Sequence, residues 1–219
     1  MKVKAIITGA TGMVGEGVLK EALRHPDVES VLIINRQPSG FTHPKLKEIV
    51  HKDFFDLTPV EDQLAGYNAV FFNLGVSSVG MKEDEYRRMT YDLTMNFART
   101  VAKKNDDVTF IYISGAGTDS TEQGSTMWAR VKGKTENDLM KLFKKAYAFR
   151  PGIMRPEPDS KNIPSWYKYL GWLYSPVKLL APNVACELPE VGSAMINAVT
   201  KGYDKHVLEV RDIIELSKR

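Results

Sequence analysis

The chain has 219 residues, of which 43% are hydrophobic and 26% charged, the composition of a globular protein with one sizeable core. Its net charge is only +3, and basic residues are interspersed with acidic ones, which argues against a nucleic-acid-binding surface. The single cysteine, Cys186, excludes an internal disulfide, and no histidine cluster accompanies it to suggest a metal site.

The first residues already have the pattern of a strand, so no secretory signal is expected. No apolar run reaches the roughly 18 residues that a membrane-spanning helix needs. We therefore expect a cytoplasmic protein, and we do not expect it to associate with membranes.

The segment 3–17 has the pattern of an apolar strand, a glycine-rich turn and a helix. Gly9, Gly12 and Gly15 stand at the G-x-x-G-x-x-G spacing. This spacing lets the chain turn sharply after the strand, lets a pyrophosphate approach the backbone, and lets the helix pack closely on the sheet. The N–H groups and partial positive charge of the helix N-terminus also favour phosphate. The segment predicts a dinucleotide site.

Further along the chain, strand and helix patterns alternate. Strands are expected at 31–34, 47–51, 69–74, 108–113, 147–150 and 207–210, and long helices at 82–104 and 126–145. This alternation predicts the α/β class, with a doubly wound parallel sheet (a Rossmann fold) that binds ligands beyond the carboxyl ends of its strands. We expect residues 1–155 to form the NAD(P)-binding domain and 156–219 a small, largely helical extension packed on it.

The end of the second strand bears on the choice of nicotinamide nucleotide. NAD-selective sites place a carboxylate there for the adenosine ribose, whereas a 2′-phosphate needs a cation. This sequence has Asn35 and Arg36, which favours NADP(H) over NAD(H) because a guanidinium can bind the phosphate. After the third strand, Asp53 or Asp56 could meet the adenine amino group, or could simply cap a turn.

Several motifs follow one another in a characteristic order. They are 9–15 (Gly-Ala-Thr-Gly-Met-Val-Gly), 73–75 (Asn-Leu-Gly), 114–117 (Ser-Gly-Ala-Gly), 132–133 (Lys-Gly) and 150–152 (Arg-Pro-Gly). Together they resemble the short-chain dehydrogenase/reductase superfamily over about residues 1–155. Within it, the segments 130–136 and 149–152 are most similar to the atypical branch that includes Tat-interacting oxidoreductase-like proteins and bacterial NAD-dependent epimerase/dehydratase-like proteins.

The resemblance implies a set of cofactor-binding residues. Gly75 would pass beside the cofactor, Lys132 would hold the nicotinamide ribose hydroxyls, and Pro151 and Gly152 would lie near the nicotinamide. With the residues inferred above, the complete expected set is Gly9, Thr11, Gly12, Met13, Val14, Gly15, Asn35, Arg36, Asp53, Phe54, Leu74, Gly75, Lys132, Pro151 and Gly152.

The catalytic residues depart from the family pattern. Active members carry Tyr-x-x-x-Lys, in which the lysine lowers the pKa of a phenol that exchanges the reaction's proton. Here the matching positions are Trp128 and Lys132, and an indole N–H cannot serve as acid or base. Ser114 matches the serine that polarises the substrate, with Thr118 and Ser120 as alternatives, although each hydroxyl could instead satisfy loop backbone groups.

Two routes would preserve catalysis without the missing phenol. A tyrosine from elsewhere could reach the nicotinamide, such as Tyr86, Tyr91 or one of the aromatic cluster in the C-terminal segment. Alternatively, a flavin or quinone substrate could accept hydride while solvent supplies the proton. Trp128 could also stack on a planar substrate or fill a wall of the pocket.

An aromatic-rich stretch follows the proline-rich turn at 151–164. It contains Trp166, Tyr167, Tyr169, Leu170, Trp172, Leu173, Tyr174, Val177, Leu179 and Leu180. Such a stretch suits a lid over the cofactor, a homodimer surface, a membrane-interface helix or a helix packed on the core. The membrane interface is least favoured because only Lys168 and Lys178 supply positive charge.

Two functions remain open. The first is an NADP(H)-binding oxidoreductase acting on a carbonyl, quinone-like or nucleotide-sugar substrate, which Lys132 and Ser114 favour. The second is a non-catalytic NADP(H)-binding redox sensor or partner-binding scaffold, which Trp128 favours. An epimerase is less favoured, because its chemistry uses the missing tyrosine and a larger C-terminal domain.

Overall fold

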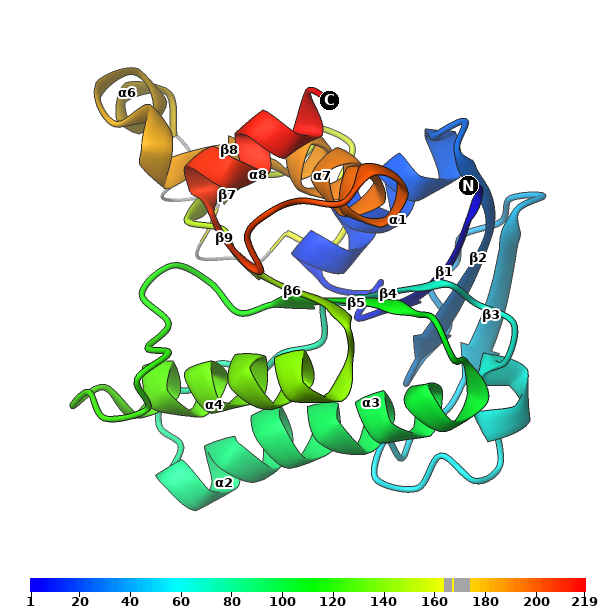
Figure 1. Ribbon diagram of the computed structural model, residues 1–219. Helices are drawn as coiled ribbons and strands as arrows, with labels where there is room; N and C mark the ends of the chain where they lie inside the picture. Colours follow the sequence, from blue (N-terminus) through cyan, green and yellow to red (C-terminus); the bar gives the residue numbers. More distant parts are fainter. Residues whose placement is uncertain (164–166, 168–173) are drawn as a thin grey trace.

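The computed structural model describes residues 1–163, 167 and 174–219. At its centre lies one seven-stranded sheet with the strand order β3-β2-β1-β4-β5-β6-β9, and all neighbouring strands are parallel (Figure 1). The strands are β1 (Val3–Thr8), β2 (Val28–Asn35), β3 (Leu46–Val50), β4 (Ala69–Phe72), β5 (Thr109–Ile113), β6 (Lys145–Arg150) and β9 (Val207–Glu209). The predicted doubly wound parallel sheet is confirmed.

Helices cover both faces of this sheet (Figure 1). One layer consists of α1 (Met13–Arg24), α7 (Leu188–Lys201) and α8 (Val210–Ser217), and the other of α2 (Glu83–Arg87), α3 (Leu93–Lys104) and α4 (Met127–Leu142). The segment α6 (Tyr174–Leu180) lies beside a small second sheet of β7 (Ile153–Arg155) and β8 (Ala185–Glu187). Within the described residues, no helix is long and apolar enough to cross a membrane.

The sheet separates two apolar layers. Ile7, Phe149 and Met195 are fully buried on the side of α1 and α7, whereas Phe72 and Phe97 are fully buried on the side of α3. Both faces of the central strands are therefore covered, which explains why their sequences are continuous apolar runs without alternation. Burial of these two layers supplies the main driving force for folding.

Several elements differ in extent from the sequence-based predictions, and three of the differences have a visible structural basis. The helix expected at 82–104 is interrupted by a π-helical turn at Arg88–Asp92. The helix expected at 126–145 ends at Leu142, because Phe143 leaves it to stack on Phe110 with 4.9 Å between ring centroids. The strand expected at 207–210 ends at Glu209, whose side chain begins α8 in a capping box with Asp212.

The C-terminal part of the chain packs against the N-terminal part. Strand β9 pairs with β6, and α7 lies so close to α1 that a Cβ on Gly17 would meet Leu188 at 2.7 Å. The Ser193 hydroxyl also donates a hydrogen bond to Glu21 across this contact at 2.7 Å. The division at residue 155 stays a prediction.

The aromatic-rich stretch is described only in part. Tyr167 and Tyr174 are buried, whereas Leu179 and Leu180 of α6 are more than 80% exposed. The other residues expected to form this surface lie largely outside the described range, namely Trp166, Tyr169, Leu170, Trp172 and Leu173. The choice among lid, dimer surface and core helix therefore stays a prediction.

A buried ion pair fixes α4 on the sheet. The Arg150 guanidinium, at the end of β6, donates to both carboxylate oxygens of Glu136 at 3.0 and 2.5 Å. Arg150 also donates to the Ser120 hydroxyl at 2.6 Å and contacts Glu209 of β9 at 3.3 Å. The Glu136 side chain is completely buried, so the geometry must satisfy both charges for the pair to be tolerated.

We predict that Glu136→Ala lowers the free energy of unfolding by about 3–5 kcal/mol, because it leaves the Arg150 charge buried without its main partner. Urea unfolding followed by circular dichroism would measure this loss. Glu215→Ala is the matched control, since its partner is the exposed Arg219 and such pairs contribute less than about 1 kcal/mol. Equal losses in the two variants would contradict the assignment.

Candidate functional site

The glycine-rich turn between β1 and α1 forms a cradle of closely packed backbone. Gly9 has φ +70°, and a Cβ on it would lie 2.9 Å from the carbonyl oxygen of Asn73. A Cβ on Gly15 would lie 2.1 Å from the carbonyl oxygen of Gly9. Both positions therefore exclude side chains for steric reasons. Gly12 is the N-cap of α1 and forms no side-chain hydrogen bond. No capping side chain therefore occupies the N–H groups at the start of α1.

A cavity of about 190 Å³ opens beside this cradle. It is lined by Gly9, Thr11, Gly12, Ile34, Asn35, Arg36, Asn73, Leu74 and Gly75. Gly75 is the informative member, because a Cβ there would have no neighbour within 4 Å and its φ is not positive. The protein itself does not require glycine at this position, so the missing side chain leaves room for a ligand.

Two residues that line this cavity carry buried side-chain acceptors without protein partners. The side-chain oxygens of Asn35 and Asn73 are buried and accept no hydrogen bond from the described part of the chain. Their amide nitrogens are occupied, that of Asn35 by Glu48 at 3.1 Å and that of Asn73 by the Phe71 carbonyl at 3.1 Å. Unsatisfied buried acceptors are costly. Because both oxygens are screened from solvent, the two side chains would have to turn toward the cavity before a ligand hydroxyl, such as that of a ribose, could bind them.

The adjoining hollow beyond β2 and β3 is cationic. It is lined by Thr11, Arg36, Gln37 and Lys52. Within the described residues, neither Arg36 nor Lys52 forms an ion pair. Two unpaired cations beside a hydroxyl and an amide form a surface suited to an anion. Arg36 was predicted from the sequence. Lys52 was not, although it directly precedes Asp53, which was expected to meet the adenine.

A third hollow adjoins the cavity at the glycine cradle and the cationic hollow, and it extends to Leu93 of α3. Asp53, Phe54 and Leu74 line it together with Arg36 and Lys52. The Asp53 carboxylate accepts a hydrogen bond from the backbone N–H of Phe55 at 2.8 Å, so it caps a turn while lining the hollow. Asp56 also caps a turn, through the N–H of Thr58 at 3.1 Å, but it does not line the hollow.

The remaining expected cofactor residues are not among those that line these three cavities. Met13, Val14 and Gly15 form the first turn of α1. The Pro151 carbonyl accepts a hydrogen bond from Ala116 at 3.0 Å, which joins the loops after β5 and β6. Gly152 packs against the backbone of Val184, where a Cβ would be only 2.2 Å from the carbonyl oxygen.

Lys132 and Ser114 lie together at the carboxyl end of β5. The Lys132 ammonium donates a hydrogen bond to the Ser114 carbonyl at 2.5 Å. The Ser114 hydroxyl itself donates to the Phe149 carbonyl at 3.2 Å and is buried. Desolvation by burial lowers the pKa of Lys132 to about 8, against the attraction of Glu136. Lys132 can therefore exchange a proton near neutral pH, which is unusual for a lysine.

The alternative hydroxyls both form hydrogen bonds within the protein. Thr118 donates to the Gly115 carbonyl at 2.8 Å, and Ser120 accepts a hydrogen bond from Arg150. Trp128 lies beside the same loop, because a Cβ on Gly117 would be 3.4 Å from its indole ring. The structure thus brings Ser114 and Lys132 together. The indole of Trp128 lies next to Gly117 in the loop after β5.

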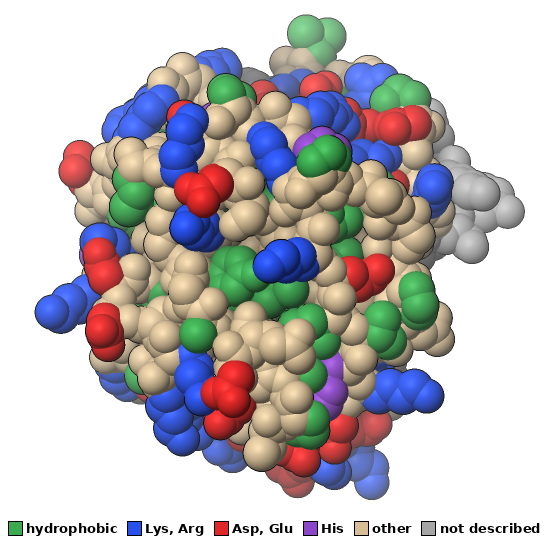
Figure 2. Space-filling view, turned by 90° about the vertical axis from the view of Figure 1, so that its right-hand side faces the viewer, with side chains coloured by type: hydrophobic (Ala, Val, Ile, Leu, Met, Phe, Trp, Pro, Cys, Tyr) green, Lys and Arg blue, Asp and Glu red, His purple; other side chains and the backbone are tan. Residues whose placement is uncertain are grey.

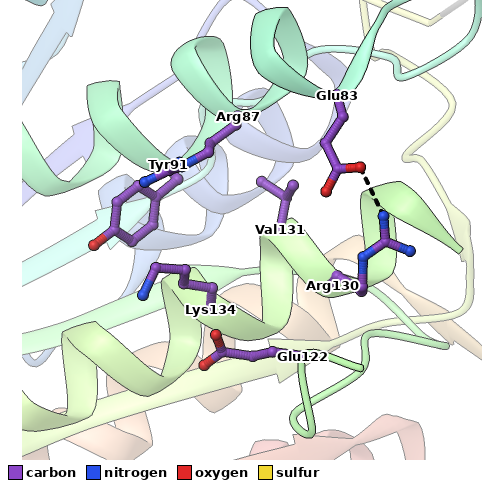
Figure 3. A pocket seen from close by; sticks show the side chains of 7 residues that line it. All are labelled: Glu83, Arg87, Tyr91, Glu122, Arg130, Val131 and Lys134. Carbon is purple, nitrogen blue, oxygen red and sulfur yellow. Dashed lines mark hydrogen bonds and ion pairs between the residues drawn. The ribbon is translucent and has the colours of Figure 1, made fainter. Parts of the chain in front are cut away.

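Tyr91 lies in a separate cleft between α2 and α4 (Figure 3). The Arg87 guanidinium and the Lys134 ammonium lie 5.5 and 5.1 Å from the centre of its ring. Its hydroxyl donates to Asp138 at 2.8 Å. The other proposed phenol, Tyr86, is 1% exposed. Neither tyrosine presents a free hydroxyl to a ligand beside Lys132.

A strap of chain crosses α1 next to the glycine cradle. Glu16, in the first turn of α1, accepts hydrogen bonds from the backbone N–H groups of Lys161 and Asn162, both at 2.8 Å. Burial alone would raise the pKa of Glu16, but these N–H groups and Lys20 outweigh it and lower the pKa. Arg24 holds the same strap through Glu157 at 2.7 Å. Sequence analysis missed this use of Glu16.

Charges of both signs are spread over the molecular surface. On the face shown in Figure 2, Lys and Arg side chains alternate with Asp and Glu side chains and do not form a continuous stripe. Within the described range, no three His, Cys, Asp or Glu side chains gather in a manner that could hold a metal ion.

Comparisons with known proteins agree with this geometry. A family model described as NAD(P)H-binding matches residues 9–148. Among solved structures, a short-chain dehydrogenase family protein from Francisella tularensis has a TM-score of 0.66 and 16% identity, covering 92% of this chain and 93% of its own. A UDP-N-acetylglucosamine 4-epimerase from Methanobrevibacter ruminantium has a TM-score of 0.67 and 16% identity, covering 98% and 81%. The predicted resemblance to short-chain dehydrogenases is confirmed for the fold, and the expected NAD(P)-binding family is confirmed by the family model.

Sequence relatives correct the expected location. Protein FMP52-1, mitochondrial, of Scheffersomyces stipitis is 26% identical, covering 98% of this chain and 99% of its own length. Protein fmp52-1, mitochondrial, of Aspergillus oryzae is 29% identical, covering 92% and 88%. Because these relatives are named mitochondrial, the expectation of a cytoplasmic protein is wrong. That expectation relied on the absence of sequence signals, which is weak evidence about location.

We predict that Gly75→Val lowers the affinity for nicotinamide nucleotides at least about 10-fold, a loss of about 1.4 kcal/mol, while the melting temperature stays unchanged. The Cβ of the added side chain would have no protein atom within 4 Å, and Gly75 lines the open cavity. Isothermal titration calorimetry and thermal unfolding would measure the two quantities, and Gly75→Ala should show a smaller loss of affinity. Full affinity in the valine variant would refute the proposed position of the ligand.

Proposed function

The chain belongs to the NAD(P)H-binding family, and from this premise we propose that it is an NADP(H)-dependent oxidoreductase that reduces a carbonyl or quinone-like compound. One observation carries the proposal. The glycine cradle, with an open cavity at Gly75, lies at the same edge of the sheet as Ser114 and Lys132. A reduced nicotinamide bound there would supply hydride, and the protein would supply binding, orientation and a proton.

Residues of the cavities fit such a cofactor. The free N–H groups at the start of α1 suit the pyrophosphate, and the unpaired side-chain oxygens of Asn35 and Asn73 suit ribose hydroxyls. Lys132 would hold the nicotinamide ribose, as the resemblance implies. The apolar side chains of Phe54 and Leu74 suit the adenine ring.

Preference for NADP(H) is supported by charge. Arg36 and Lys52 line one hollow that has no acidic lining residue, and they share the adjoining hollow with Asp53. Strand β2 ends at Asn35, where an NAD-selective site would carry a carboxylate. A 2′-phosphate would bind both cations, whereas the hydroxyl of NAD(H) would leave them unused.

A second function is favoured by Trp128. Its indole cannot replace the phenol of the family's usual mechanism, and it occupies the wall of the loop after β5. A protein that binds NADP(H) without consuming it could serve as a redox sensor or as a scaffold for a partner. Turnover of reduced cofactor distinguishes the two functions.

The first experiment is calorimetric titration with NADPH, NADP⁺, NADH and NAD⁺, followed by assays of NADPH oxidation with aldehydes, quinones and flavins. Binding of NADPH with turnover of any of these acceptors would support the enzyme. Binding that distinguishes NADPH from NADP⁺ without turnover would support the sensor. If none of the four nucleotides binds, both functions fail.

We predict that Arg36→Glu weakens NADPH binding roughly 10- to 100-fold, the loss of one charge-assisted contact of about 1.5–3 kcal/mol. NADH binding should change much less, because NADH lacks the 2′-phosphate. Lys201→Glu makes the same charge change at the far end of α7 and should alter neither affinity. Equal weakening of NADPH and NADH by Arg36→Glu would refute the assignment.

A further inference from the structure

Lys132 occupies a defined position between two strand ends. It lies one helical turn after Trp128 on α4, and its ammonium is bound to the Ser114 carbonyl. The backbone N–H of Ser114 is in turn bound to the Phe149 carbonyl of β6 at 2.9 Å. This single carbonyl contact leaves two N–H bonds of the ammonium for other partners.

No carboxylate within ion-pair distance neutralises Lys132 among the described residues. The nearest charged group on its own helix, Glu136, is held by Arg150, and Arg150 also contacts Glu209 of β9. In the adjoining loop, the Asp119 carboxylate is bound to Thr121 and to the backbone N–H of Gly124. Lys132 is therefore half-buried without a counterion, and desolvation lowers its pKa to about 8.

The described tyrosines do not supply a phenol to this position. Tyr86 is buried and Tyr91 is bound to Asp138. The others lie in the interior (Tyr112, Tyr174), make hydrogen bonds elsewhere (Tyr147, Tyr167, Tyr203) or precede β4 at the opposite edge of the sheet (Tyr67). Tyr169 lies outside the described residues. Lys132 is therefore the titratable side chain that contacts Ser114 at the carboxyl end of β5 and forms no ion pair within the described residues.

We propose that Lys132 is itself the proton donor of the reduction, in place of the phenol that Trp128 has replaced. This inference rests on the proposed oxidoreductase function and names the acid that it requires. Because an acid works best when its pKa lies near the working pH, a lysine that titrates near pH 8 is suited to this task.

The substrate's carbonyl carbon gains a hydride from the reduced cofactor, and the electron pair of the C=O π bond moves to the oxygen. That oxygen forms a bond to one proton of the Lys132 ammonium, whose N–H electron pair stays on nitrogen. The neutral amine then regains a proton from water. The substrate is reduced to the alcohol, and the cofactor is oxidised.

Calorimetry tests the titration of Lys132 without any substrate. NADP⁺ is titrated at pH 8 in buffers of different ionisation enthalpy, which reveals the protons released on binding. The positive nicotinamide ring should lower the pKa of the nearby ammonium, so the unchanged protein should release a fraction of a proton. Lys132→Arg should bind NADP⁺ more weakly, because Lys132 also holds the nicotinamide ribose, and at saturating NADP⁺ it should release no proton, because arginine stays protonated. The control Lys134→Arg, in which Asp138 is the partner of the altered side chain, should release protons as before.

Assays of NADPH oxidation with aldehydes test the proton transfer. We expect the rate of the unchanged protein to fall as the pH rises through about 8, because the ammonium is lost. Lys132→Arg should bind NADPH but turn over about 100-fold more slowly or worse, the usual contribution of a general acid. Lys132→Met serves as a second variant if the arginine variant does not fold, with thermal unfolding as the check.

The outcomes separate this proposal from the proposed function. Undiminished turnover by Lys132→Arg, or equal proton release by it, would overturn the role of Lys132 and leave the oxidoreductase intact. Cofactor binding by the unchanged protein without reduction of any aldehyde, quinone or flavin would overturn both and favour the sensor. Failure to bind any of the four nucleotides would overturn the nucleotide site itself.

Discussion

The buried ion pair between Glu136 and Arg150 is the interaction on which the rest of the candidate site depends. It joins α4 to the end of β6, and through Glu209 it also joins both to β9. Because Lys132 lies one turn before Glu136, the pair fixes the height of Lys132 relative to the sheet. A pair of this kind contributes little net stability, since two charges lose their hydration. Its effect here is to select one placement of α4.

Close backbone contact reinforces that placement. A Cβ on Gly133 would lie 1.8 Å from the Asp119 carbonyl oxygen, so α4 rests directly on the loop after β5. The same loop carries Gly117 next to Trp128 and receives the ammonium of Lys132 through Ser114. Sterics and charge therefore act on the same few residues. The helix can neither slide nor rotate without breaking one of these contacts.

Much of the fold could be predicted because its signals are local. Continuous apolar runs identified the buried strands, and the spacing of Gly9, Gly12 and Gly15 identified the turn before α1. The end of α4 could not be predicted, because Phe143 leaves the helix for a tertiary contact with Phe110. Lys52 was missed for a related reason: only the pairing of β2 with β3 brings it to the hollow beside Arg36. Likewise, the lowered pKa of Lys132 arises from enclosure by several elements, which residue spacing does not report.

Strand β9 has a consequence for how the site comes into being. The edge of β6 stays open until the segment that forms β9 has been synthesised, after α6 and α7. Only then does Glu209 reach Arg150. Contacts between segments so far apart in the chain form late and slowly. The charged groups around Arg150 are therefore complete only once the segment 207–209 has left the ribosome, and a nascent chain lacking it carries the glycine turn before α4, β6 and β9 are joined.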